Sequence, residues 1–83
     1  MIKHTEINAA ILRQYIRQGI VCLGGNGKLG IYGTLHCRSG KRMKKSNRVF
    51  FMSQEEAAAM GYRPCGHCLK QEYLKWKHGA VQH

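Results

Sequence analysis

The sequence predicts a single small α+β domain, in which a short antiparallel sheet carries flanking helices. Three observations predict this class: a chain of only 83 residues, apolar residues at helical spacing, and short β-branched or aromatic runs between the helical segments. A chain of this length buries only about 60–65% of its unfolded surface, so we expect a cross-link or a metal ion to support the fold. Residues 1–83 are therefore interpreted as one domain that is stabilised by a cross-link or a metal ion.

Helical periodicity predicts a first helix over residues 6–18. Thr5 is a suitable N-cap, and Gly19 stands where a C-terminal glycine is favoured. The apolar face of this helix consists of Ile7, Ile11, Leu12, Tyr15 and Ile16. We expect that face to pack on the core.

Three short runs predict the strands, namely 20–23, 28–35 and 48–52. The first two flank the cluster Gly24-Gly25-Asn26-Gly27, which is typical of a hairpin turn. The cluster lacks the Lys-Ser/Thr ending of a phosphate-binding loop and precedes a strand, so a phosphate cradle is not expected.

Two further helices are predicted after the strands. Ser53-Gln54-Glu55-Glu56 is a capping box, which starts a helix that ends near Gly61. A last helix is predicted over residues 69–77, with frayed residues beyond it.

Four cysteines indicate a metal site. Cys65-Gly66-His67-Cys68 is a knuckle in which two thiolates reach one tetrahedral ion from a single turn, and Cys22 and Cys37 bring the set to four. The composition of this set predicts Zn²⁺ as the cofactor, and in so short a chain its binding contributes to folding.

Two classes of enzyme are excluded by the sequence. The chain has no Asp, and its four Glu residues lie on predicted helices, which argues against paired-carboxylate hydrolysis. The Cys-Gly-His-Cys pattern also occurs in redox proteins, but a thioredoxin-like domain needs about a hundred residues of βαβ architecture. Here a capped helix and Arg63-Pro64 precede the knuckle instead.

The charge balance indicates a polyanionic partner. Fourteen Lys and Arg residues face four acidic ones, which gives a net charge of +10. The basic residues predicted to contact nucleic acid are Arg38, Lys41, Arg42, Lys44, Lys45, Arg48, Arg63 and Lys70. Such contacts would position a phosphate backbone without reading bases. The alternative interpretation of residues 38–48 is a solvated charged loop.

The N-terminal sequence favours a cytoplasmic protein. It turns polar after two residues, and no apolar run approaches the roughly 18 residues of a membrane span. We expect a monomer without a membrane partner.

Three segments resemble the N-terminal metal-binding domain of the Ada family of bacterial DNA alkylation-repair proteins. They are Gly30-Ile31-Tyr32-Gly33-Thr34-Leu35-His36-Cys37, Asn47-Arg48-Val49-Phe50-Phe51 and Ala57-Ala58-Ala59-Met60-Gly61-Tyr62-Arg63-Pro64-Cys65-Gly66-His67-Cys68, within a similar stretch of about residues 20–70. The resemblance implies a small zinc-stabilised α+β fold with a four-cysteine site. It also implies that one coordinating thiolate takes a methyl group from a methylphosphotriester in DNA, after which the domain binds DNA more tightly.

The chain departs from the family at the methyl-accepting position. Alignment of Gly30-Ile31-Tyr32 places Gly33 at that cysteine, while Cys37, Cys65 and Cys68 match the other three ligands. An alternative alignment makes Cys37 the reactive residue and places Lys41 at the second cysteine.

The fourth ligand therefore has two candidates. Cys22 is the first, because its predicted strand should pair with the strand that contains Gly33. His36 is the second, although neighbours on a strand point to opposite faces and His36 adjoins Cys37.

The sequence as a whole predicts a nucleic-acid-binding domain, with DNA as the first partner and a mainly structural zinc. One alternative is a methyl-accepting repair or sensor domain that uses Cys22 or Cys37. Another is a protein-interaction module whose basic face meets an acidic partner.

Overall fold

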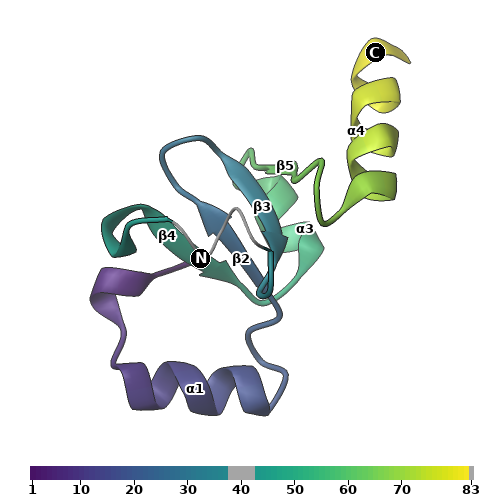
Figure 1. The fold of residues 1–83 in the computed structure, drawn as a ribbon. Helices are drawn as coiled ribbons and strands as arrows, with labels where there is room; N and C mark the ends of the chain where they lie inside the picture. Colours follow the sequence, from purple (N-terminus) through teal and green to yellow (C-terminus); the bar gives the residue numbers. More distant parts are fainter. Residues whose placement is uncertain (38–42, 83) are drawn as a thin grey trace.

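The computed structural model describes residues 1–37 and 43–82, with side chains as far as residue 78. A five-stranded sheet in the order β1-β4-β2-β3-β5 forms its centre (Figure 1). The elements are β1 (Ile2–Lys3), η1 (His4–Glu6), α1 (Ala9–Arg17), β2 (Leu23–Asn26), β3 (Ile31–Thr34), η2 (Lys45–Asn47), β4 (Arg48–Phe51), α3 (Gln54–Ala59), β5 (Arg63–Pro64) and α4 (Lys70–Gln82), where η marks a 3₁₀ turn. The α+β class is as predicted.

The sheet is mixed, which corrects the expectation of a purely antiparallel sheet. The β1–β4, β4–β2 and β2–β3 pairs are antiparallel, whereas β3 and β5 are parallel. Both edge strands contain only two residues, so no alternation of apolar and polar residues indicates them in the sequence.

The glycine cluster at residues 24–27 was predicted as a turn, but most of it lies in the central strand β2. Gly25 is in close contact with its neighbours: a Cβ there would lie 2.8 Å from the carbonyl oxygen of Ile31 and 3.1 Å from the ring of Phe51. The strand therefore needs glycine because neighbouring groups leave no room for a side chain.

The first and last helices differ in extent from the prediction. Asn8, rather than Thr5, caps α1, and its side-chain oxygen accepts a hydrogen bond of 2.8 Å from the N–H of Ala10. Glu6, predicted as the first helical residue, belongs to η1 instead, and α1 begins at Ala9. The last helix, α4, continues to Gln82 rather than ending near residue 77.

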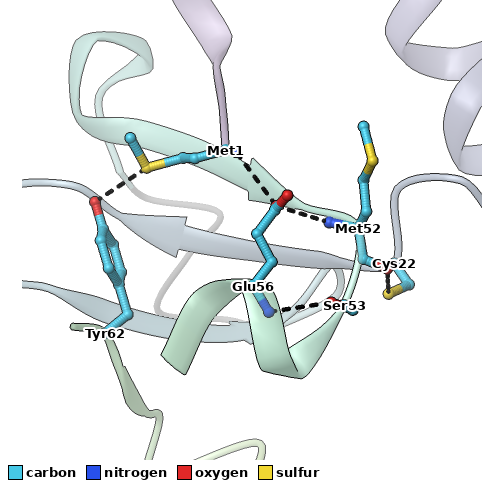
Figure 2. A network of polar contacts seen from close by, with 6 residues as sticks. All are labelled: Met1, Cys22, Met52, Ser53, Glu56 and Tyr62. Carbon is cyan, nitrogen blue, oxygen red and sulfur yellow. Dashed lines mark hydrogen bonds and ion pairs between the residues drawn. The ribbon is translucent and has the colours of Figure 1, made fainter. Parts of the chain in front are cut away.

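The Ser53 half of the capping box of α3 is present, but the Glu56 carboxylate does not bond back to the N–H of Ser53 as in a complete capping box. The hydroxyl of Ser53 accepts from the N–H of Glu56 at 3.1 Å. The Glu56 carboxylate accepts from the N–H of Met52 at 3.2 Å and forms an ion pair of 3.3 Å with the amino group of Met1 (Figure 2). The start of α3 is thereby tied to the N-terminus.

Two apolar cores form around β4, because its successive side chains point to opposite faces of the sheet. The first core contains Tyr32, Val49, Phe51 and Ala57, packed against Leu23, Tyr62 and Leu69. The second contains Leu12, Val21 and Phe50, packed against Ile2, Ile7, Tyr15 and Leu35. The first core includes α3 and the second includes α1, whereas α4 projects beyond the sheet (Figure 1).

Within the described part of the chain, no helix combines the length and the apolar character that a membrane crossing requires.

Candidate metal centre

Three cysteines meet at the β3–β5 end of the sheet. Cys37 follows β3, Cys65 follows β5, and Cys68 lies in the turn before α4. Their sulfur atoms all lie within 4.8 Å of one another, and those of Cys37 and Cys65 are 3.8 Å apart. Tetrahedral thiolates at about 2.3 Å from zinc are themselves about 3.8 Å apart. The observed spacing therefore fits a metal ion of this kind.

The parallel pairing of β3 and β5 positions two of these thiols. The N–H of Cys65 donates to the carbonyl of Tyr32 at 2.7 Å, which fixes the chain just after β5. The N–H of Cys37 donates to the carbonyl of Thr34 at 3.3 Å and turns the chain back after β3. The carbonyl of Cys65 in turn accepts from the N–H of Leu69 at 3.0 Å, which closes the knuckle.

Backbone N–H groups point at two of the sulfurs. The N–H of Thr34 donates to Cys68 Sγ at 3.3 Å, and the N–H of His67 donates to Cys65 Sγ at 3.4 Å. Donors of this kind stabilise a thiolate and orient it toward a metal ion. Burial raises the pKa of the Cys68 thiol, while the hydrogen bond from Thr34 acts in the opposite direction.

Gly33 lies against all three cysteines. A Cβ at this position would be 2.6 Å from Cys68 Sγ, 3.2 Å from Cys65 Cβ and 3.9 Å from Cys37 Cβ. The absence of a side chain lets the Cys68 thiol approach β3 and accept the Thr34 N–H. Position 33 is therefore part of the metal centre, although glycine supplies no ligand atom.

The structure does not bring Cys22 to this cluster, which corrects the expectation that it completes the site. Cys22 precedes β2, and its N–H donates to the carbonyl of Phe51, on the β4 side of that strand. Its exposed thiol donates to the carbonyl of Met52 at 3.1 Å (Figure 2). The prediction placed Cys22 beside the strand that contains Gly33, whereas its hydrogen bonds go to Phe51 and Met52 instead.

The histidines near the cluster are not part of its donor set. His36 and His67 are both exposed, and neither joins the group formed by the three thiols in the described part of the chain. The fourth-ligand alternative based on His36 is therefore also not observed.

A pocket of about 420 Å³ lies beside the thiols. Cys37 and Cys65 form part of its wall, as do the predicted basic residues Arg48 and Arg63. Of the other predicted basic residues, Lys44, Lys45 and Lys70 are exposed, and Arg38, Lys41 and Arg42 lie outside the described residues. Of the five predicted cations that the structure describes, two therefore line the pocket beside the thiols.

Aromatic rings hold both of these arginines, a feature that the sequence analysis missed. The guanidinium of Arg63 lies 5.3 Å from the ring centre of Tyr73 and 5.9 Å from that of Trp76, and these two rings stack. The guanidinium of Arg48 lies 5.6 Å from the ring centre of Phe50. The spacing of Tyr73 and Trp76, three residues apart on one helix, was the signal available in the sequence.

The fold and the three clustered thiols define a small α+β metal-binding domain. A family model described as the metal binding domain of Ada matches residues 12–71, so the chain belongs to this family. Searches of curated proteins and of solved structures returned no match.

Proposed function

We propose that this domain binds DNA, or another nucleic acid, through its phosphate backbone, and that a zinc ion held by Cys37, Cys65 and Cys68 supports the binding surface. Zinc prefers thiolate ligands and tetrahedral geometry, and the three sulfurs provide three such ligands at a spacing that fits a tetrahedral site. When bound, the ion keeps these sulfurs deprotonated at neutral pH and cross-links β3, β5 and the knuckle.

The observation that supports nucleic-acid binding best is the charge of the pocket beside the thiols. Its wall contains Arg48 and Arg63 and, among the described residues that line it, no carboxylate. A cavity lined by one sign of charge attracts the opposite sign, and guanidinium groups bind phosphate with paired N–H donors.

The aromatic contacts prepare Arg63 for such binding. One N–H group of Arg63 donates to the carbonyl of Pro64 at 3.1 Å, and the guanidinium lies over the rings of Tyr73 and Trp76. These contacts limit the conformations of the side chain and leave further N–H donors for a phosphate. Trp76 is 44% exposed and offers a surface on which an unpaired base can stack.

The affinity for a labelled DNA duplex, measured by fluorescence anisotropy at several salt concentrations, tests this proposal. We expect log K to fall linearly with log salt concentration, and Arg48→Gln and Arg63→Gln each to reduce the slope by about 0.9. Arg13→Gln is the matched control, because Arg13 is an exposed arginine on α1 and does not line the pocket. Salt-independent binding, no binding, or an equal loss in Arg13→Gln would contradict the proposal.

Methyl acceptance is tested separately. Incubation with methylphosphotriester DNA should leave the intact mass of the protein unchanged, because position 33, where the family alignment places the accepting cysteine, is glycine. A mass increase of one methyl group would instead support the repair alternative.

A further inference from the structure

The metal centre draws three ligands from the described part of the chain. Cys37, Cys65 and Cys68 form the group, and no other Cys, His, Asp or Glu among the described residues joins them. A tetrahedral thiophilic ion held in this way accepts one further ligand, preferably sulfur. Position 33, which contacts all three cysteines, has no side chain with which to provide it.

The pocket adjoins one side of this centre. Cys37 and Cys65 line it, whereas Cys68 turns toward Thr34. Four of the lining residues are glycines, namely Gly24, Gly25, Gly33 and Gly66, and Gly33 leaves the space next to the cysteines free of a side chain. A volume of about 420 Å³ lies within the range of small-molecule sites, which is roughly 300–1,000 Å³.

The chemistry of the pocket wall selects a particular kind of small molecule. Arg48 and Arg63 provide positive charge, and neither takes part in an ion pair within the described residues. Apolar surface comes from Leu29, Ile31, Met43 and Tyr73. The wall therefore matches a short organic anion whose carbon chain lies between the arginines and the thiols.

We propose that the pocket binds a small thiol that carries an anionic group. Its sulfur joins those of Cys37, Cys65 and Cys68 as the fourth sulfur of the metal centre, and its anionic group pairs with Arg63 or Arg48. The thiol binds as the thiolate and releases its proton to solvent, without any change in oxidation state. This inference goes beyond nucleic-acid binding and does not depend on it.

A titration of the cobalt(II)-loaded protein, residues 1–83, with 3-mercaptopropionate tests the proposal. The sulfur-to-cobalt charge-transfer absorbance should rise in a saturable manner by about one third, as three thiolates become four. Propionate, which lacks the sulfur, should have no effect, and 2-mercaptoethanol, which lacks the charge, should bind more weakly. An unchanged absorbance with 3-mercaptopropionate, or a starting absorbance already typical of four thiolates, would overturn the proposal.

Variants separate the role of the arginines from that of the metal. Arg63→Gln should lower the affinity for 3-mercaptopropionate by about ten-fold and leave the affinity for 2-mercaptoethanol unchanged. Only the first ligand offers an anion to the guanidinium. Arg13→Gln should bind both ligands like the wild type. Equal weakening of both ligands in Arg63→Gln would contradict the proposed orientation.

A substitution at position 33 provides a second, independent check. Gly33→Cys should supply the fourth sulfur from within the chain and abolish the response to added thiol. Its Cβ would require the Cys68 thiol to move, since the two would otherwise be 2.6 Å apart. If this variant fails to fold, the wild-type and Arg63→Gln titrations still decide the question. The titrations contain no nucleic acid, so their failure is distinct from failure of DNA binding.

Discussion

The two edges of the sheet are held together in different ways. At the β1–β4 edge, Leu12 of α1, Val21 and Phe50 form an apolar core, and stability is spread over many contacts. At the β3–β5 edge, the chain is gathered around Cys37, Cys65 and Cys68. The comparison teaches that an 83-residue metal-binding domain can add a cluster of three metal-ligating thiols to the apolar packing around Tyr32 at one edge, whereas the other edge relies on packing.

Loss of a metal ligand should have the largest effect. Cys65→Ser removes one of three sulfurs, and we expect metal affinity to fall by more than about a hundred-fold, since changes in the outer shell alone cost about 10–100-fold. Structural zinc sites contribute about 10–16 kcal/mol of apparent binding free energy, so the β3–β5 edge should also lose its folded structure. Competition with a chromophoric chelator measures the affinity, and backbone hydrogen exchange measures the structure.

The matched control for this prediction is Cys22→Ser. Cys22 is an exposed cysteine outside the cluster, so its substitution should leave metal affinity and the fold of the β3–β5 edge unchanged. A comparable loss of metal in Cys22→Ser would restore Cys22 as a ligand and would remove the basis for a three-cysteine centre.

The sequence predicted the three cysteines that cluster, but it also assigned to the site a fourth cysteine, Cys22, that lies elsewhere. Cys65 and Cys68 could be predicted as ligands from a short motif, because both thiols come from one turn. The alignment with the family segments then indicated Cys37 as a third ligand. Cys22 was assigned from strand pairing, which the sequence constrains weakly. Strand β2, which begins one residue after Cys22, pairs with both β3 and β4, and the hydrogen bonds of Cys22 to Phe51 and Met52 keep its thiol on the β4 side.

The fold was predicted where local signals were strong. The start of β4 at Arg48 and the Ser53 cap of α3 follow from an aromatic strand and a capping pattern, both of which act over a few residues. The strand role of Gly25 was missed, because it depends on the carbonyl of Ile31 and the ring of Phe51, which only the assembled sheet brings close. The two-residue edge strands were missed because they are too short to show an alternation of apolar and polar residues.

An intermediate effect is expected at the apolar edge. Phe50→Ala should lower the free energy of unfolding of the metal-loaded protein by about 3–5 kcal/mol, because Phe50 is 3% exposed and truncation leaves a cavity beside Leu12 and Val21. The number of sulfurs bound to cobalt should stay the same. Urea unfolding measures the first quantity and the charge-transfer absorbance the second.

The conservative variant Phe50→Leu should lose less stability than Phe50→Ala, because it fills most of the same space. If Phe50→Ala also removed a sulfur from the metal centre at low urea concentration, the two edges would behave as one unit. The inference that the β1–β4 edge depends on packing and the β3–β5 edge on metal ligation would then be wrong.

The smallest predicted effect concerns His4, on the apolar edge. The ring of His4 packs edge-on against Phe50 with 5.3 Å between ring centres. Its Nδ1 atom is buried, with no hydrogen-bond partner among the described residues. Burial lowers the pKa of His4 below its usual value of 6.5, and the nearby charges of Lys45 and Arg48 lower it further.

The direction of the pH dependence follows from this lowered pKa. The unfolded chain takes up a proton on His4 as the pH falls below about 6.5, before the folded chain does, so the contribution of His4 is complete above that pH and is lost as the pH falls toward the folded pKa. His4→Gln removes this titration. The free energy of unfolding should therefore drop less between pH 7.5 and pH 5.5 in His4→Gln than in the wild type. Because both proteins keep the same metal ligands, proton competition for the thiolates cancels in the difference, and an equal drop in both would show that the half-buried ring of His4 does not couple the β1–β4 edge to pH.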